Sequence, residues 1–307
     1  MEARKLHTLE LTAAKLRNLA MDQVYAADSG HIGGSLSVAD ILTVLYFDRM
    51  KVNPETPKAP DRDRLVLSKG HTTPALYAAL ALKGYFPKER LKLFRSVEGH
   101  MSGHPDMVNV PGVDMSTGSL GQGISAAVGM ALAGKIDRKD YRVYAILGDG
   151  EVEEGQVWEA TMAAAKYHLD NLTAVVDVNG LQIDGATADV MPSEPLDKKF
   201  EAFNWNVIRV DGHDLAALEE AFLQAAACKD RPSVLVAKTV KGKGVSFMEN
   251  DAGWHGKAPN EKQYAVAHAE LQERIRICTD VVAAEAMKSA QEVLKELGLD
   301  GDEGEEN

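Results

Sequence analysis

Three segments near the start of the chain carry apolar residues at every third or fourth position, the spacing of a helix with one buried face. The first has its apolar positions over residues 6–24 and predicts a helix that ends at residues 28–30, Asp-Ser-Gly. The second follows Ser37, which forms a candidate capping box with Asp40. Pro74 suits the first turn of the third helix, and Gly84 suits its end. The pattern therefore predicts several helices before the main run of strands.

Short, continuous apolar runs alternate with helical segments over most of the remaining chain. Runs without polar alternation are typical of strands buried on both faces, as in a parallel sheet covered by helices. The expected strands are 64–67, 143–147, 172–178, 207–210 and 234–237, and the helices between them include 157–168 and 215–227. This alternation predicts an α/β fold, a doubly wound parallel sheet with helices on both faces.

No composition break interrupts this pattern before about residue 260, so one domain is expected over residues 1–260. The other segments are a surface excursion over 185–199 with Pro192 and Pro195, two helices at 261–277 and 281–297 that pack, as segment 261–298, on the domain or on a partner, and an acidic, disordered tail at 299–307.

Charge narrows the range of partners. The 307 residues carry a formal net charge of −12, and the last eight residues contain five of the acidic groups. Nucleic acids and anionic membranes require clustered Lys and Arg, which the sequence lacks, so neither is expected as a partner. Small anions are not excluded, because helix amino termini and metals bind them without net positive charge.

The cysteines, the amino terminus and one uncharged segment indicate where in the cell the protein is expected. Cys228 and Cys278 are too few for a disulfide framework and have no partner at metal-ligand spacing. The amino terminus has interleaved charges and no apolar signal-peptide core, so a cytoplasmic location is expected. Residues 115–134 contain no charge, but their many glycines and Ser, Thr and Gln residues argue against a membrane span.

Oxygen donors follow two successive predicted strands. Asp149 comes directly after strand 143–147, and Asn179 directly after strand 172–178. Ligands of parallel sheets bind beyond the carboxyl ends of the strands, where Asp149 and Asn179 would emerge side by side and suit Mg²⁺ or Ca²⁺ with a diphosphate. Gly150 is expected to open the next helix, with its N–H groups toward that anion. Gly-Asp-Gly and Asn-Gly are also common turns, which is the structural alternative.

Four of the nine histidines stand beside glycine in predicted loops: His31, His71, His104 and His255. Each alone is more often a surface or capping residue. Their spacing fits no zinc signature. Together they favour a polar pocket that binds hydroxyl groups and moves protons.

Two more segments are ambiguous. The segment Thr117–Gly123 is not a dinucleotide fingerprint and fits either a glycine wall for a flat ring or close helix packing. Glu151, Glu153 and Glu154 follow the candidate metal motif, and the helix dipole accounts for most of that run. Glu154 could face a neighbouring subunit.

Seven segments resemble, in order and spacing, the amino-terminal, diphosphate-binding part of transketolase over about residues 20–260. They are SGHIGGSLS, DRDRLVLSKGH, SGHP, STGSLGQGIS, GDGEVEEGQVWEA, the strand end at Asn179 with IDG, and WHG. The resemblance implies a thiamin diphosphate-binding fold, thiamine diphosphate as cofactor and a divalent metal, Mg²⁺ or else Ca²⁺ or Mn²⁺.

The resemblance also implies roles for individual residues. The metal ligands would be Asp149, Asn179 and the carbonyl of Leu181. The residues along the cofactor would be Gly150 at the diphosphate, His71, His255 and, at the aminopyrimidine, Gly118, Ser119 and Leu120. The residues that contact ketose hydroxyls and assist proton transfer would be His31, His104 and His255.

The implied reaction is transfer of a two-carbon ketol unit from a ketose phosphate, of the xylulose 5-phosphate type, to an aldose phosphate. In single-chain transketolases a second domain supplies the glutamate that protonates the aminopyrimidine, and nothing after residue 260 resembles that domain. We therefore expect a separate carboxy-terminal, pyrimidine-binding subunit to complete the site, in an α₂β₂ assembly of the pentose phosphate pathway.

Other assignments remain open at this level. A specialised-sugar transketolase, the α chain of a 2-oxo acid dehydrogenase and a deoxyxylulose-phosphate synthase share parts of the pattern. A non-catalytic cofactor-binding subunit would keep the same residues but give no ketol transfer with any partner. An NAD-binding module would be stabilised by NAD rather than by thiamine diphosphate.

Overall fold

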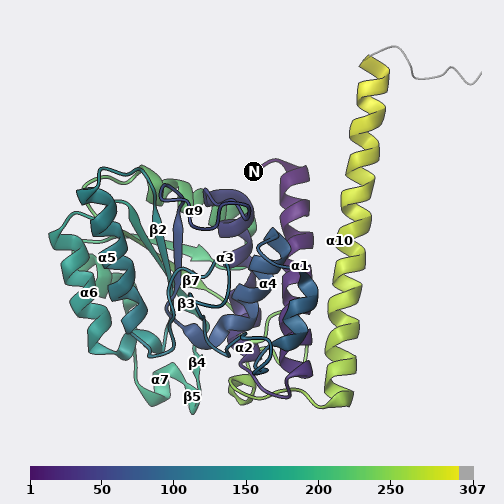
Figure 1. Ribbon diagram of the computed structural model, residues 1–307, viewed down its shortest axis with the longest axis horizontal. Coiled ribbons are helices and arrows are strands. Elements are labelled where there is room, and N and C mark those ends of the chain that lie inside the picture. Colours follow the sequence, from purple (N-terminus) through teal and green to yellow (C-terminus); the bar gives the residue numbers. More distant parts are fainter. Residues whose placement is uncertain (297–307) are drawn as a thin grey trace, which may run out of the picture.

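The computed structural model describes residues 1–296 (Figure 1). The helices are α1 (Ala3–Ala26), α2 (Ile32–Ser37), α3 (Ala39–Val44), α4 (Thr73–Lys83), α5 (Gln122–Ile136), α6 (Gly155–Lys166), α7 (Thr187–Val190), α8 (Leu196–Ala202), α9 (Leu215–Ala227) and α10 (Glu261–Glu296). The strands are β1 (Arg64–Leu67), β2 (Val143–Gly148), β3 (Leu172–Val178), β4 (Leu181–Gln182), β5 (Gly185–Ala186), β6 (Asn206–Asp211) and β7 (Ser233–Lys238). Shorter π or 3₁₀ turns cover Leu45–Arg49, Gly70–Thr72, Lys88–Leu93, Glu151–Glu153 and Ala252–Trp254.

Five parallel strands form the central sheet in the order β1-β2-β3-β7-β6, and β4 and β5 form a separate antiparallel pair. Ala145 of β2 lies opposite Val66 of β1 and Ala174 of β3, so the strands are nearly in register. The predicted strands 64–67 and 172–178 are confirmed at both ends, and the other three extend one residue further at one or both ends. Because all five strands are parallel, their carboxyl ends meet at one edge of the sheet.

The sheet is covered on both faces, which confirms the doubly wound architecture. Alternate strand residues point to opposite sides, as Leu65 and Val66 show. Leu65 belongs to a core shared with α3, α4 and α9. Val66 belongs to a second core shared with α5, α6 and α8. Figure 1 shows α5 and α6 on one side of the strands and α3 and α4 on the other.

The carboxy-terminal part differs from the prediction of two helices. A single helix, α10, runs over Glu261–Glu296, because residues 278–280 contain neither Gly nor Pro to interrupt it. It packs along α1, with Ala267 and Leu271 in a shared apolar core, and extends past the start of α1 (Figure 1). The predicted end at Leu297 and the predicted disorder of 299–307 lie outside the described residues.

The predicted capping box at Ser37 is wrong. Ser37 is the last residue of α2, and α3 begins at Ala39 without a side-chain cap. The Ser37 hydroxyl instead donates to Asp177 Oδ2 at 2.6 Å and lies 2.9 Å from the carbonyl oxygen of Gly34. The spacing of the sequence predicted that this hydroxyl caps a helix, but it binds the buried carboxylate of Asp177 on β3.

The predicted excursion at 185–199 is ordered. It contains β5, α7 and the start of α8, and Leu196 and Phe200 of α8 are buried in the core shared with α5 and α6. Residues 188–192, Glu194, Pro195 and Lys198 are exposed, so most of the segment lies at the surface, as expected.

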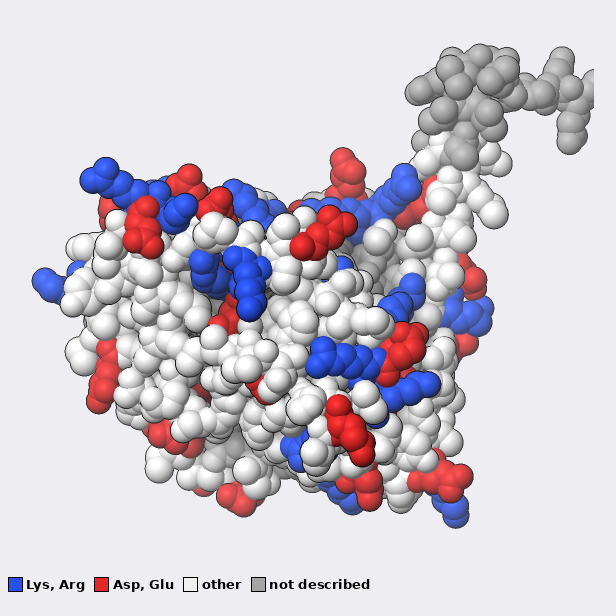
Figure 2. Space-filling view, viewed as in Figure 1, with Lys and Arg blue, Asp and Glu red and all other residues white. Residues whose placement is uncertain are grey.

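The surface charges, the helices and the cysteines give three further observations. Figure 2 shows acidic and basic side chains interspersed on the face in view. Within residues 1–296, no helix is both long enough and apolar enough to cross a membrane. Cys228 and Cys278 are both free thiols, as expected.

Candidate active site

A cavity of about 250 Å³ opens at the carboxyl edge of the sheet. Most of the residues that the sequence singled out line it: His71, Leu120, Asp149, Gly150, Asn179, Leu181 and His255. They come from the ends of β1, β2 and β3 and from distant loops. The parallel sheet thus brings together side chains that are up to 184 positions apart, since His71 and His255 share one wall.

The oxygen donors meet as predicted at the ends of β2 and β3. Asp149 is buried, and its Oδ2 accepts a hydrogen bond from the Gly180 N–H at 2.5 Å. Asn179 Oδ1 accepts from the Leu181 N–H at 3.1 Å. Burial and the nearby charge of Asp177 raise the pKa of Asp149 to about 6. A cation next to Asp149 would stabilise the ionised form of this carboxyl group.

The carbonyl of Leu181 already faces a positive charge. Lys241 Nζ donates to this carbonyl at 2.9 Å and lies 3.0 Å from His255 Nδ1. Burial and the charge of Lys69 lower the pKa of Lys241 to about 8. Within residues 1–296, no three His, Cys, Asp or Glu side chains gather to hold a metal. A metal here would need the mixed set of carboxylate, amide and carbonyl oxygens, which suits a hard cation such as Mg²⁺.

Gly150 does not open the following helix, contrary to expectation. A 3₁₀ turn covers Glu151–Glu153, and α6 begins only at Gly155 after an extended Glu154. A Cβ on Gly150 would lie 2.7 Å from Gln182 Oε1, so the Gln182 side chain approaches this backbone closely. Gly150 lines the cavity.

The four glycine-flanked histidines form one cluster. The ring centroids of His71 and His255 are 5.0 Å apart. The ring centroid of His31 lies 5.3 Å from that of His71 and 5.5 Å from that of His255. His104 is further out, 6.2 Å from His31. His31 Nδ1 is buried without a hydrogen-bond partner among the described residues. The cluster therefore presents an imidazole nitrogen that a ligand could use.

All four imidazoles are shifted toward the neutral form. Burial, with the charge of Arg95, lowers the pKa of His31 to about 4, and burial, with the charge of Lys241, lowers that of His255 to about 3. The pKa of His71 and that of His104 also lie below the ordinary value, mainly because of burial. At neutral pH the four imidazoles are therefore uncharged, and each can accept a hydrogen bond at one ring nitrogen and donate one at the other.

The glycine-rich segment lies against this cluster. A Cβ on Gly118 would lie 3.0 Å from the His104 ring, and Gly118 has a φ of +149°. Leu120 lines the cavity, whereas Ser119 is exposed. Gly121, at a φ of +82°, leads into α5. The sequence left two alternatives for this segment, close packing or a wall of the cavity, and the structure shows both.

Glu151 has a role that sequence reasoning missed. Its buried carboxylate accepts hydrogen bonds from the backbone N–H groups of Gly121 and Gly148, each at 3.0 Å, and from the Ser68 hydroxyl. Burial raises the pKa of Glu151. The carboxylate thus ties the glycine-rich segment to the ends of β1 and β2. The helix dipole, invoked for the whole acidic run, does not explain it.

Replacing Glu151 with glutamine is expected to lower the free energy of unfolding by about 1–3 kcal/mol, because the amide NH₂ would face a backbone donor instead of accepting from it. Urea unfolding of the chain measures this change. Glu154→Gln, at an exposed position three residues on, is the control and should leave stability unchanged. Equal effects of both variants would contradict the bridging role.

Lys69 and Lys241 are further cavity residues that the sequence reasoning left out. Lys69 is buried in an ion pair with Asp177, whose carboxylate also accepts from Ser37 and Thr239. Lys241 lies just beyond the carboxyl end of β7. The rule that selected Asp149 and Asn179, applied to the other strand ends, would have found both lysines.

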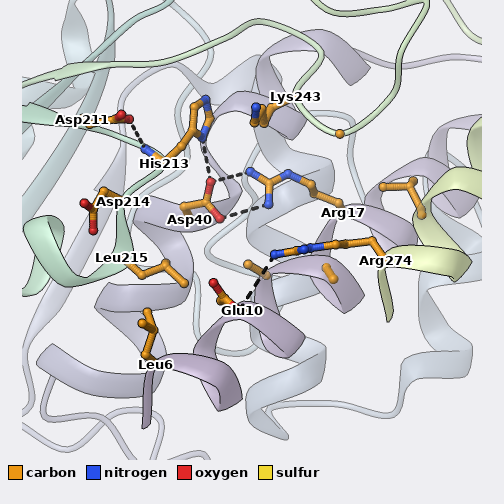
Figure 3. Close-up of a pocket in the computed structure, with 14 residues that line it drawn as sticks. Leu6, Glu10, Arg17, Asp40, Asp211, His213, Asp214, Leu215, Lys243 and Arg274 are labelled. Atoms are coloured by element: carbon orange, nitrogen blue, oxygen red, sulfur yellow. Dashed lines mark hydrogen bonds and ion pairs between the residues drawn. The ribbon is translucent and has the colours of Figure 1, made fainter. Parts of the chain in front are cut away.

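A hydrogen-bonded network supports the segment that carries Lys241. Figure 3 shows Asp40 between Arg17 and His213, on the wall of a separate cavity of about 650 Å³. His213 Nδ1 contacts Asp40 Oδ2 at 2.7 Å, and its Nε2 accepts from the Val240 N–H at 2.8 Å. Because Nε2 accepts, Nδ1 carries the proton. No residue that the sequence predicted for the site lines this cavity. Within the network, His213 holds the backbone at Val240, next to Lys241.

Known proteins resemble this chain over nearly its whole length. Residues 9–296 match the family model described as "Transketolase, thiamine diphosphate binding domain". The 6-deoxy-6-sulfo-D-fructose transketolase subunit SqwG of Clostridium sp. (strain MSTE9) is 47% identical over 86% of this chain and 96% of that protein. One subunit of the apulose-4-phosphate transketolase of Phocaeicola vulgatus is 44% identical over 88% of this chain and 96% of that protein.

Longer transketolases match over part of their length. Human transketolase is 39% identical over 95% of this chain but only 46% of its own length. The structure of transketolase from Leishmania mexicana superposes with a TM-score of 0.80 at 32% identity, covering 94% of this chain and 47% of that one. The chain thus spans about half the length of these relatives. By family model, sequence identity and structure, the chain belongs to the thiamine diphosphate-binding domain family of transketolases.

Proposed function

We propose that this chain is the amino-terminal subunit of a two-chain, thiamine diphosphate-dependent transketolase that transfers a two-carbon ketol unit between sugars. The observation that carries the proposal is the cavity in which the oxygens of Asp149, Asn179 and Leu181 lie beside neutral imidazoles. Two relatives that are themselves named transketolase subunits match over 96% of their length, which supports the division into two chains.

The residues present fit a metal diphosphate. The Leu181 carbonyl already attracts the Lys241 ammonium, and Asp149 has a raised pKa that a cation would relieve. We assign Asp149, Asn179 and the Leu181 carbonyl to Mg²⁺, and the Gly150 backbone to the diphosphate. His71, His255 and the segment Gly118–Leu120, with Ser119 at its exposed edge, would hold the rest of the cofactor. Bound thiamine diphosphate supplies the nucleophilic carbon and the electron sink for cleavage of the C2–C3 bond.

His31, His104 and His255 are assigned to the sugar. Because their pKa values lie below the ordinary range, they are neutral near pH 7. A neutral imidazole can accept the proton of a ketose hydroxyl at one nitrogen while donating at the other.

His104→Ala is expected to lower kcat by about 100-fold or more while leaving thiamine diphosphate affinity unchanged, because His104 lies outside the cofactor cavity. Steady-state kinetics of the two-chain enzyme and calorimetric titration of the cofactor measure the two quantities. His268→Ala, on α10, is the control. An unchanged kcat would remove His104 from the sugar site.

The partner we propose is a pyrimidine-binding subunit, with two copies of each chain in the enzyme. Native pull-down of this chain from its own cells, followed by an assay with xylulose 5-phosphate and ribose 5-phosphate, tests this proposal. Ketol transfer that requires a co-purified second chain supports it. Transfer by this chain alone contradicts the two-chain division, and failure with every ketose donor, even with the partner, contradicts transketolase activity.

A further inference from the structure

We propose that Lys241 is a positioning residue that fixes the tautomer of His255, so that His255 presents a hydrogen-bond donor to the sugar. The inference rests on the proposed transketolase function and deepens it, because it narrows the role of one of the three histidines assigned to the sugar. It concerns the two ring nitrogens of His255, which are chemically distinct in a neutral imidazole.

The ammonium of Lys241 meets one edge of the His255 ring. Its Nζ lies 3.0 Å from His255 Nδ1 and donates to the Leu181 carbonyl at 2.9 Å. Lys241 is only 2% exposed, and both side chains line the cavity of about 250 Å³. Buried N–H groups need acceptors. The Leu181 carbonyl therefore takes one of the ammonium donors, and His255 Nδ1 is in position to take another.

The chemistry of the two groups decides the direction of this second hydrogen bond. An ammonium has three N–H donors and no acceptor, whereas a neutral imidazole accepts at the nitrogen that lacks the proton. His255 is neutral at pH 7, because burial, with the charge of Lys241, lowers its pKa to about 3. His255 Nδ1 is therefore the acceptor, and the single ring proton is on Nε2.

The backbone and the stem of Lys241 are both held in place. His213 Nε2 accepts from the Val240 N–H at 2.8 Å, and the Lys241 carbonyl accepts from the Asn250 N–H at 2.9 Å. The stem of the side chain passes close to Gly33, where an added Cβ would lie 3.1 Å from Lys241 Cγ. These contacts restrict where the ammonium can lie, and so favour its contact with Nδ1.

Neighbouring rings restrain the orientation of the His255 imidazole. His71 stacks on it at 5.0 Å between centroids, with 26° between the ring planes, and His31 meets it edge-on at 5.5 Å and 86°. With the ring held and Nδ1 bonded to Lys241, Nε2 is the nitrogen left for a ligand. His31 differs, because its Nδ1 has no hydrogen-bond partner among residues 1–296.

A fixed tautomer gives His255 one role at the sugar. With the proton on Nε2, it donates to a sugar oxygen, and it cannot accept a hydroxyl proton at the nitrogen that is bonded to Lys241. A donor aimed at an oxygen that gains negative charge during ketol transfer stabilises that charge. Acceptance of a hydroxyl proton is then left to other groups of the site.

Nitrogen-15 NMR of the full chain, labelled at histidine, tests this assignment, because protonated and unprotonated ring nitrogens have well-separated chemical shifts. His255→Gln identifies the His255 signals by their loss. In the wild-type chain the Nε2–H form of His255 is expected to exceed the Nδ1–H form by about tenfold or more, the ratio that a hydrogen bond to a charged group gives. The same ratio is expected with Mg²⁺ and thiamine diphosphate added.

Two substitutions of Lys241 and one control separate its donor from its bulk. Lys241→Met removes the donor, so both tautomers of His255 should appear in comparable amounts. Lys241→Arg keeps a cation that can only donate and should restore the Nε2–H form. Lys243→Met is the control, because Lys243 is 39% exposed and pairs with Glu249 instead. In the two-chain enzyme, at saturating Mg²⁺ and thiamine diphosphate, Lys241→Met should lower kcat by about tenfold or more, and Lys243→Met should not change it.

An Nδ1–H tautomer of His255 in the wild-type chain would overturn the proposal, whether or not the variants fold. An unchanged tautomer ratio in a folded Lys241→Met chain would overturn it too, because other contacts would then set the tautomer. A mixed tautomer with an unchanged kcat would overturn the role of this donor at the sugar. A wild-type complex that transfers no ketol unit from any ketose would contradict the proposed function, while the NMR result would stand.

Discussion

Replacing Asp149 with alanine is expected to abolish the magnesium-dependent binding of thiamine diphosphate. Asp149 is the one carboxylate in the proposed donor set, and its neighbours Asn179 and Leu181 offer only neutral oxygens. Loss of a residue that merely supports a metal ligand weakens metal binding by about 10- to 100-fold, so loss of the charged ligand itself should exceed that range.

Calorimetric titration with thiamine diphosphate, with and without Mg²⁺, measures the effect in the wild-type chain and the variant. Asp184→Ala is the matched control, because Asp184 lines the same cavity but is exposed. It should retain magnesium-dependent binding. Wild-type affinity in Asp149→Ala would contradict the metal site.

Binding of Mg²⁺ should also depend on pH. Burial and the charge of Asp177 raise the pKa of Asp149 to about 6, so below that pH the metal must displace a proton. The affinity for Mg²⁺ is expected to fall by up to about tenfold for each pH unit below 6. Titrations at several pH values measure this slope, and an unchanged affinity at acid pH would contradict the assignment of Asp149.

Breaking the ion pair between Lys69 and Asp177 is expected to have the largest effect on stability. Both side chains are almost wholly buried, with 2% and 0% exposed. Burial raises the pKa of Asp177, but the Lys69 charge and the hydrogen bonds from Lys69, Ser37 and Thr239 outweigh it and lower the pKa overall. Removing either partner leaves a buried charge unpaired, which costs about 3–5 kcal/mol.

A double-mutant cycle in urea unfolding tests this expectation. Lys69→Met and Asp177→Asn should each lower the free energy of unfolding by that amount, and the double variant should lose less than their sum. Lys135→Met breaks a pair with Asp170 in which the lysine is 41% exposed, so it should cost about 1 kcal/mol or less. Additive losses in the cycle would show that the two charges do not depend on each other.

Much of this protein was predictable from local patterns. The strands at 64–67 and 172–178 and the helix at 215–227 have the predicted bounds, because buried strands and amphipathic helices leave a periodic record of which face is apolar. Asp149 and Asn179 were predictable as neighbours, because consecutive parallel strands end at the same edge. The resemblance to transketolases rested on segments whose spacing is visible in the sequence alone.

Tertiary structure decided which polar groups meet across long separations. Ser37 satisfies Asp177 on a central strand instead of capping a helix, and Glu151 accepts from Gly121 and Gly148 instead of standing at a helix start. The contact of Lys241 with Leu181 depends on how loops after two different strands approach each other. The spacing of residues along the chain does not predict such long-range pairs. A buried donor or acceptor takes whichever partner the packed elements bring within reach, and this depends on the whole fold.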